Sequence, residues 1–465
     1  MSYDIVIKGG MLASSKGTTR ADLGIRGETI AASGLDLEGR EVIDATGKLV
    51  LPGAIDVHNH FQLPFCGTVS ADDFVSGSRA AALGGVTSFL DFAIQARPQS
   101  VMEAIAARRD EADPKVCIDY GLHPGITEWN ADRVAEIPEI IKAGYPTFKM
   151  FMIYKAQGWQ STDSDLYAAL RETAKHGGMV GVHAESNDLI ELLQGEFDAS
   201  RTPGCYAHTL TRPAVTEFEA ISRAINLAEA TGGRLYIFHM STSRGTEAVW
   251  EGQNRGVDVH AETGPHYLLL DDELFKRDDG HHFATCPPIR KPEDQEGLWM
   301  GLASSVIEVL ATDTCTFNSQ QKAMWEGDYT KIPFGMPGIE TLLPLTYSYG
   351  VGRGRISLGR MIKVLCENPA ILFGMWGRKG SLDVGKDADV VDFDPDLSLT
   401  ITPDALATNC DYSPFDGTEI TGWPTHTLLR GKVIVRDRKF VGEIGGGKFI
   451  AREPHTPDDD DGNEE

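Results

Sequence analysis

The 465-residue sequence has no long apolar run, no closely spaced cysteine pair and an excess of acidic over basic residues. No stretch approaches the roughly 20 consecutive apolar residues that a membrane-spanning helix needs. The opening residues, Met1 to Ile5, contain no basic segment followed by an apolar core, so no secretory signal is indicated. We therefore expect a cytoplasmic protein that does not interact with membranes.

The cysteines and the charge argue against three further classes of site or partner. Seven cysteines are scattered singly without a Cys-x-x-Cys pair, which argues against a disulfide framework and against a thiolate zinc site. The formal net charge of -25 at pH 7 repels polyanions, so a nucleic-acid partner is not expected. Part of this charge lies in residues 458–465, a polyacidic run that we expect to be a disordered tail.

The composition is that of an ordinary globular protein, with 41% hydrophobic and 24% charged residues. The pattern of apolar residues differs between the two ends and the centre of the chain. Short strand patterns broken by turns occur near both ends, and the Gly431-Lys432 step between apolar runs is typical of a hairpin. We predict a small β-sandwich domain built from residues 1–52 and 379–440. A large central domain takes residues 53–378, and a C-terminal extension takes residues 441–465.

The central region alternates apolar, β-rich runs with helical patterns such as residues 70–83, 165–176 and 215–231. Eight such βα units in about 320 residues are the number and size of a (β/α)8 TIM barrel, an α/β fold. A doubly wound open sheet is the alternative, but no glycine-rich phosphate turn follows the first strand. The predicted barrel strands are residues 54–60, 86–93, 115–123, 147–152, 179–185, 234–241, 258–268 and 306–315.

Histidines and one aspartate stand where several of these strands end. His58 and His60 are two residues apart on an extended strand, so both imidazoles point to the same side. His183, His239 and Asp313 end three other strands, and the carboxyl ends of barrel strands form the active face. Imidazole and carboxylate ligands together suit zinc or a similar divalent ion. The sequence therefore predicts a metal site.

Lys149 is unusual because it stands among apolar residues on the fourth predicted strand. A buried ammonium is costly unless it is paired or chemically altered. One interpretation is an ion pair with a nearby carboxylate such as Asp119. The other is a reaction with carbon dioxide that gives a carbamate, an anionic oxygen ligand able to bridge two metals. The residues alone leave both open.

The order His-x-His, lysine, histidine, histidine, aspartate resembles the binuclear metal amidohydrolase superfamily. Longer segments are similar to its cyclic amidohydrolases, the D-hydantoinase and dihydropyrimidinase family. They include residues 66–74 (Cys-Gly-Thr-Val-Ser-Ala-Asp-Asp-Phe) and 313–318 (Asp-Thr-Cys-Thr-Phe-Asn). Residues 379–382 (Lys-Gly-Ser-Leu) and 385–389 (Gly-Lys-Asp-Ala-Asp) match a pattern shared more widely across cyclic amidohydrolases. The resemblance covers nearly the whole chain, including both ends.

The resemblance implies two divalent metal ions, Zn²⁺ with Mn²⁺ or Fe²⁺ as alternatives, bridged by N6-carboxylated Lys149. The metal ligands that it implies are His58, His60, Lys149, His183, His239 and Asp313. A hydroxide that bridges the metals is then the nucleophile, and Asp313 is the acid and base. Tyr154 matches the tyrosine that polarises the substrate carbonyl. The family also implies a homo-oligomer, a tetramer or a dimer.

The expected substrate pocket includes apolar residues near the mouth of the barrel, Leu63, Phe65 and Phe151. Two ring-binding segments depart from the hydantoinase pattern. Pro337 stands where asparagine is usual and has no N–H to donate, and Cys286 stands where serine is usual. An uncharged hydantoin, dihydropyrimidine or related cyclic imide fits these loops better than a carboxylated ring.

Two alternative functions remain open at this point. Residues 335–345 look more like those of dihydroorotases and allantoinases, although Gln62 stands where dihydroorotases place an arginine. Some relatives of dihydropyrimidinase are non-catalytic scaffolds that have lost metal ligands. Because every metal ligand of the family pattern is present here, we favour hydrolysis of a cyclic amide or ureide C–N bond.

Overall fold

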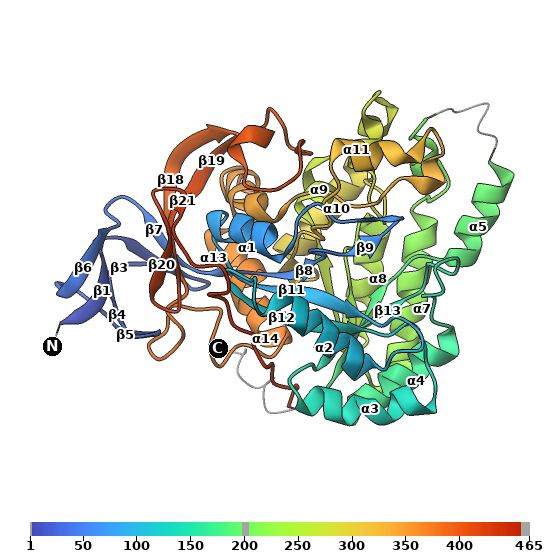
Figure 1. The fold of residues 1–465 in the computed structure, drawn as a ribbon, viewed down its shortest axis with the longest axis horizontal. Coiled ribbons are helices and arrows are strands. Elements are labelled where there is room, and N and C mark those ends of the chain that lie inside the picture. Colours follow the sequence, from blue (N-terminus) through green and yellow to red (C-terminus); the bar gives the residue numbers. More distant parts are fainter. Residues whose placement is uncertain (1, 198–203, 457–465) are drawn as a thin grey trace.

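The computed structural model describes residues 2–197 and 204–456, and its centre is a barrel of parallel strands (Figure 1). Eight strands pair in the order β17-β16-β15-β14-β13-β12-β11-β8, each one parallel to its neighbours. They span Ala54–Asn59 (β8), Val86–Ile94 (β11), Asp119–Gly125 (β12), Thr147–Phe151 (β13), Met179–His183 (β14), Arg234–Ile237 (β15), Val259–Thr263 (β16) and Val309–Leu310 (β17). All eight predicted strands are present, and the barrel prediction is confirmed.

The barrel closes at its carboxyl end. Asn59, the last residue of β8, forms a parallel bridge with Thr314, beyond the end of β17, and the backbone N–H of His60 donates to the carbonyl of Thr314 at 2.8 Å. The strands are buried on both faces, as in barrels whose outer face is covered by helices. This closure brings the ends of the first and last strands side by side.

Helices surround the barrel in Figure 1, and several begin at a residue whose side chain accepts from free backbone N–H groups. Asp73, Ser100 and Thr162 cap three of them in this way. The α-helices are Phe74–Leu83 (α1), Val101–Ala112 (α2), Ala131–Lys142 (α3), Asp163–Ala174 (α4), Asn187–Glu196 (α5), Ala207–Leu210 (α6), Val215–Thr231 (α7), Ser243–Asn254 (α8), Pro265–Leu269 (α9), Pro292–Ala303 (α10), Ser319–Lys322 (α11), Leu342–Leu345 (α12), Leu358–Ile362 (α13) and Asn368–Leu372 (α14).

Three predicted strands run too far along the sequence. Residues 258–268 include β16 and then α9, because Pro265 is pre-organised for the first turn of a helix and has no N–H to give to a sheet. Residues 306–315 form a strand only at Val309–Leu310, and residues 234–241 only at Arg234–Ile237. His239 and Asp313 therefore lie in loops just beyond the strands, with φ of 39° and 50°.

Strands from both ends of the chain form two further sheets. One has the order β5-β4-β1-β6 and the other the order β21-β20-β19-β18-β7-β2-β3, so N-terminal and C-terminal strands share the second sheet. Their bounds are Tyr3–Lys8 (β1), Met11–Ser14 (β2), Gly17–Arg20 (β3), Asp22–Arg26 (β4), Thr29–Gly34 (β5), Gly39–Asp44 (β6), Leu49–Pro52 (β7), Val390–Thr400 (β18), Glu419–Leu429 (β19), Lys432–Arg436 (β20) and Lys439–Phe440 (β21).

The packing of these sheets agrees with a small sandwich built from both chain ends. Ile7, Leu23 and Ile25 share one buried apolar cluster with Val390 and Leu428 from the other end of the sequence. The predicted hairpin is present between β19 and β20, where Arg430 and Gly431 both have positive φ, as a tight hairpin turn requires. The exact domain boundaries stay a prediction, and the predicted acidic tail at 458–465 lies outside the described residues.

Among residues 2–197 and 204–456, no helix has both the length and the apolar character needed to cross a membrane.

Candidate metal centre and active-site pocket

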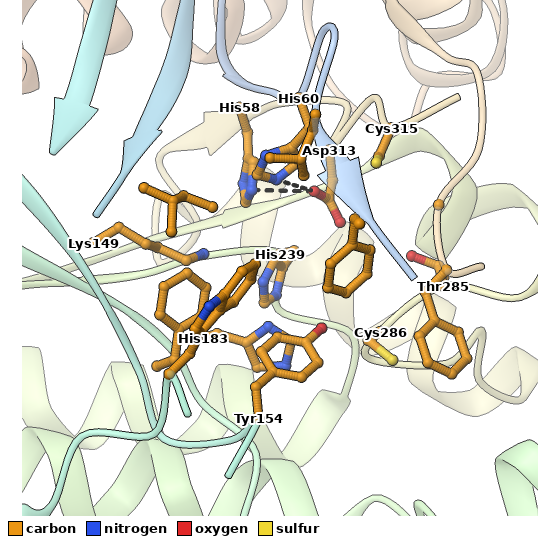
Figure 2. Close-up of a pocket in the computed structure, with 17 residues that line it drawn as sticks. His58, His60, Lys149, Tyr154, His183, His239, Thr285, Cys286, Asp313 and Cys315 are labelled. Atoms are coloured by element: carbon orange, nitrogen blue, oxygen red, sulfur yellow. Dashed lines mark ion pairs between the residues drawn. The ribbon is translucent and has the colours of Figure 1, made fainter. Parts of the chain in front are cut away.

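A pocket opens at the carboxyl end of the barrel (Figure 2). It collects side chains from segments far apart in the sequence, as expected for the active face of such a barrel. Of the residues predicted for the site, those that line this cavity are His58, His60, Leu63, Phe65, Lys149, Phe151, Tyr154, His183, His239, Cys286 and Asp313. Pro337 does not line it.

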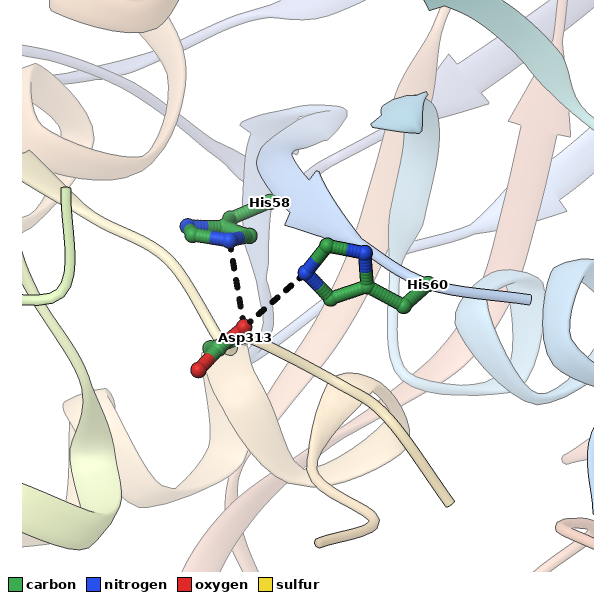
Figure 3. A group of neighbouring side chains, drawn as sticks. All are labelled: His58, His60 and Asp313. Atoms are coloured by element: carbon green, nitrogen blue, oxygen red, sulfur yellow. Dashed lines mark ion pairs between the residues drawn. The ribbon is translucent and has the colours of Figure 1, made fainter. Parts of the chain in front are cut away.

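Three of these residues form a compact group of ligand-type atoms (Figure 3). Asp313 Oδ1 lies 3.1 Å from Nε2 of His58 and 3.3 Å from Nε2 of His60. Each of the three residues offers one ligand atom, and these atoms lie within 4.8 Å of one another. Burial holds the pKa of His58 well below its usual value, so the imidazole is neutral, the form that binds metals. Although burial opposes it, His58 and His60 hold the pKa of Asp313 below its usual range.

The other two histidines lie on the opposite side of the pocket. The rings of His183 and His239 meet edge to face with their centroids 4.4 Å apart, and the His239 ring lies 5.2 Å from that of His58. In Figure 2 the amine of Lys149 points into the space between His58 and His183. Four imidazoles, one carboxylate and one amine therefore face the same small volume.

Carboxylates outside the pocket orient two of the imidazoles. Glu262 contacts Nδ1 of His58 and accepts from the Tyr236 hydroxyl at 2.9 Å. Glu185 lies 2.8 Å from Nε2 of His183 and pairs with Arg212 at 2.9 Å. Such partners fix which ring nitrogen is left for a metal. Sequence reasoning missed both glutamates, although Glu185 stands only two residues after His183.

The donor atoms fit a divalent metal. Nδ1 of His239 is buried without a hydrogen-bond partner among the described residues, and Nε2 of His58, although 3.1 Å from Asp313, makes no hydrogen bond there. A buried polar atom without a partner costs about 1–3 kcal/mol, which a metal–nitrogen bond removes. Imidazole nitrogen with carboxylate oxygen is a donor set typical of zinc and of similar first-row ions.

Lys149 is 1% exposed and forms no ion pair with any carboxylate of the described residues. Its Nζ lies 3.8 Å from the centroid of the Phe238 ring. The interpretation that pairs it with Asp119 is wrong, because Asp119 is already paired with Lys379 at 2.7 Å and with Arg430. Burial lowers the pKa of Lys149 to about 7, so a large fraction of this amine is neutral at neutral pH.

Aromatic rings form one wall of the pocket. Tyr154 has φ of 69°, and its ring lies 5.2 Å from the ring of His183. Loss of solvent around its hydroxyl raises the pKa of Tyr154 well above the usual value, so the group remains a proton donor. Phe65 and Trp159 stack with centroids 5.7 Å apart, and Phe151 lies 5.3 Å from Trp159. Trp159 was missed because its position follows from the loop, not from a strand pattern.

Cys286 and Pro337 have different surroundings. Cys286 lines the pocket, and burial raises the pKa of its thiol to about 12, which leaves it uncharged and a poor nucleophile. Its loop is held in place because His208 Nε2 contacts the carbonyl of Thr285 at 2.9 Å. Pro337 instead lines a small adjoining cavity, which Thr285 and Asp313 also reach.

Comparisons with known proteins agree with this geometry. The model of the family described as "Amidohydrolase family" matches residues 49–434. D-hydantoinase from Geobacillus stearothermophilus is 40% identical over 454 residues, covering 96% of each chain, and D-hydantoinase from Ralstonia pickettii is 38% identical, covering 97% of this chain and 99% of its own. The crystal structure of dihydropyrimidinase from Brevibacillus agri NCHU1002 matches with a TM-score of 0.95 at 36% identity, over 97% of this chain and 99% of that one.

Proposed function

The chain is an enzyme of the amidohydrolase family, in the branch of the D-hydantoinases and dihydropyrimidinases, and we propose that it hydrolyses a C–N bond of a hydantoin, dihydropyrimidine or related cyclic imide. One observation carries this proposal most strongly: four histidines, Lys149 and Asp313 converge on the pocket at the carboxyl end of the barrel. A scaffold homologue without activity has no need to keep such a set.

For the metals, we propose that His58, His60 and Asp313 hold one divalent ion and that His183 and His239 hold a second. Zn²⁺ suits these donors best, with Mn²⁺ and Fe²⁺ as alternatives. When bound, the ions supply a nucleophilic oxygen at neutral pH and polarise the scissile carbonyl.

Carboxylated Lys149 is the proposed bridge between the two ions. The neutral amine nitrogen forms a bond to the carbon of carbon dioxide, one C=O electron pair moves to oxygen, and the nitrogen releases a proton. The product is an anion where an ammonium would be repelled by two cations. The lack of any ion pair to Lys149 among the described residues supports this chemistry.

The residues around the scissile bond have distinct proposed roles. Asp313 accepts the proton of the attacking water and returns it to the ring nitrogen that leaves, as general base and then general acid. The Tyr154 hydroxyl stays protonated and donates to the carbonyl oxygen as negative charge develops on it. Both side chains line the same pocket, so one bound ring can contact both.

The pocket lining favours an uncharged ring. None of the described residues that line it is an arginine, so the carboxylate of a dihydroorotate-like ring has no guanidinium partner there. Leu63, Phe65, Phe151 and Trp159 offer apolar surface to a ring substituent. The main chain around Cys286 is the proposed partner of the ring amide, whereas Pro337 faces the neighbouring cavity.

The test is a hydrolysis screen on metal-loaded protein with hydantoin, phenylhydantoin, dihydrouracil, succinimide, allantoin and dihydroorotate. We expect loss of the uncharged rings, abolished by chelation, restored by Zn²⁺ with bicarbonate, and absent in Asp313→Ala. Preference for allantoin or dihydroorotate would move the substrate assignment to the alternative activities. No turnover of any ring by protein that holds two ions per chain would contradict the proposed function.

Two further proposals rest on the family alone, namely a homo-oligomer, tetramer or dimer, and a cytoplasmic location. Light scattering of the purified protein tests the first, and fractionation of cells that produce it tests the second.

A further inference from the structure

His266 is a buried histidine at the active face that the proposed mechanism does not use. It lies in α9, three residues after β16 ends, and is 6% exposed. It lines a small cavity, with room for about one water molecule, that also reaches Asp313, Thr285 and Pro337. Through Asp313 and Thr285, this cavity adjoins the main pocket, which those two residues also line.

One ring nitrogen of His266 has no hydrogen-bond partner. Its Nε2 is buried and unpartnered within the described residues. Leaving a buried polar atom unpaired costs about 1–3 kcal/mol, so such atoms usually bind water or a ligand. A cavity can hold an ordered water when it offers two or more polar partners, and the imidazole and the Asp313 carboxylate are two.

The position of the ring is fixed by its neighbours. It lies against the ring of Tyr267, with centroids 4.0 Å apart, and the Tyr267 hydroxyl donates to the carbonyl of Pro287 at 2.8 Å. On the other side, a Cβ at Gly264 would come within 2.5 Å of Cε1 of His266. Glycine at position 264 is therefore what leaves room for the imidazole.

Asp313 has one oxygen free to face such a water. Both contacts to His58 and His60 use Oδ1, and Figure 3 shows the second oxygen pointing away from the two imidazoles. Burial lowers the pKa of His266 to about 4, with the Asp313 carboxylate opposing the shift, so the imidazole is neutral at neutral pH. A neutral ring can donate from one nitrogen and accept at the other.

We propose that His266 is a positioning residue for Asp313, to which it connects through a water molecule held in the cavity between them. The water donates to the free oxygen of Asp313 and is held by a ring nitrogen of His266. This link keeps the carboxylate in the orientation from which it takes a proton from the attacking water and delivers it to the leaving nitrogen. The expected effect on kcat rests on the proposed function, whereas the water-mediated contact between His266 and Asp313 does not.

The contact can be tested without any activity. A crystal structure of the metal-loaded protein should show an ordered water within about 3.2 Å of a ring nitrogen of His266 and of the Asp313 carboxylate. In His266→Phe this water should be gone. A direct protein contact to His266, or a cavity with no ordered water in the wild type, would overturn the proposal whatever the enzyme hydrolyses.

The kinetic test compares three variants on the best ring of the substrate screen. His266→Phe should lower kcat by about 10- to 100-fold with KM and metal content unchanged, a range typical for the loss of an orienting partner. His266→Gln, which keeps hydrogen-bonding groups, should recover most of the rate. Gly264→Ala should act like His266→Phe because the added methyl displaces the ring.

The matched control is His176→Gln, which changes a histidine between α4 and β14 that pairs with Glu172. It should leave kcat and KM unchanged. A rise in KM alone in His266→Phe would mean that His266 binds substrate instead, and equal losses in the Phe and Gln variants would mean a purely steric role; either result overturns the proposal. If wild type hydrolyses no ring, the proposed function fails, and the crystal structures still decide on the water link.

Discussion

Two buried lysines near opposite ends of the same barrel have opposite surroundings. Lys379, 2% exposed, lies where the amino end of the barrel meets the end sheets and pairs with Asp119 at 2.7 Å, Asp389 at 2.6 Å and Asp387 at 3.0 Å. Lys149, 1% exposed, faces the pocket at the carboxyl end and has no carboxylate partner among the described residues. Burial costs both ammonium groups alike, but only Lys379 recovers the cost from ion pairs.

The difference separates two uses of buried charge. At the amino end, paired charges join distant parts of the chain: Lys379 and Arg430 both reach Asp119, across more than two hundred positions of sequence. At the carboxyl end, groups with unmatched atoms are kept where chemistry needs them, including Lys149, His58 and His239. Perturbed titratable groups without structural partners are typical of active sites.

Breaking the unpaired site should have the largest effect on activity. In Lys149→Met the proposed carbamate cannot form, so we expect bound metal to fall well below two ions per chain. We expect kcat/KM to fall by about 1,000-fold or more, roughly 4 kcal/mol of activation free energy. The metal-free protein should be at least as stable as the metal-free wild type, because an unpaired buried amine is removed. Elemental analysis, kinetics and thermal unfolding measure the three quantities, and full metal content in the variant would contradict the carbamate.

The same substitution at the paired lysine should have the reverse pattern. Lys379→Met leaves three carboxylates around an apolar side chain, and breaking a buried ion pair typically costs about 3–5 kcal/mol in the free energy of unfolding. Metal content and kcat per folded chain should stay within about twofold of the wild type. Denaturant unfolding and active-chain titration decide the point. A large loss of kcat at unchanged stability in Lys379→Met would contradict the purely structural role assigned to Lys379.

Within the pocket, Tyr154→Phe isolates the proposed oxyanion donor. Losing one preorganised donor costs about 100- to 1,000-fold in kcat. Because the substitution removes only the hydroxyl and keeps the ring that packs against His183, we expect the melting temperature and the metal content to stay nearly unchanged. Steady-state kinetics on the best ring, with calorimetry as the control, measure both. An unchanged kcat would remove Tyr154 from the mechanism.

The sequence predicted the residues at the carboxyl end of the barrel better than the ion pairs at its amino end. Strand periodicity located the barrel, and the barrel then placed His58, His60, Lys149, His183 and His239 at one end, because parallel strands all end on the same face. Nothing local in the sequence reveals that Asp119 is taken by Lys379 and Arg430, since those contacts depend on how the end sheets dock.

Other misses have a similar physical cause. Trp159 and His266 stand outside regular strands, in a loop and in a short helix, where residue spacing says little about direction. The alternation of apolar residues did not reveal that a helix starts at Pro265, directly after β16. The proline itself was a usable signal, because proline is favoured in the first turn of a helix. Pro337, predicted for the substrate pocket, lines the neighbouring cavity instead.

The smallest expected effect concerns a paired histidine at the amino end. His260 lies between Glu308, 2.5 Å from Nδ1, and Asp258, 2.7 Å from Nε2; Arg234 pairs with Asp258 as well. Although burial opposes it, these carboxylates raise the pKa of His260 to about 9. Because the pKa of His260 is higher in the folded state, its protonation stabilises the fold. This contribution is fully present below the unfolded-state pKa of about 6.5 and is lost as the pH rises through about 9.

We therefore expect His260→Gln to lower the free energy of unfolding by about 1–2 kcal/mol at pH 6, with solvent screening at Asp258 taken into account. At pH 10 the difference from the wild type should nearly vanish. Denaturant unfolding at the two pH values measures it, and kcat at pH 7 to 8 should not change. This result would mean that the charge of His260, at the amino end, contributes to stability and not to catalysis. Lys149, at the carboxyl end, would have the opposite role. A pH-independent penalty would instead mean that His260 acts through packing and that its ion pairs contribute little.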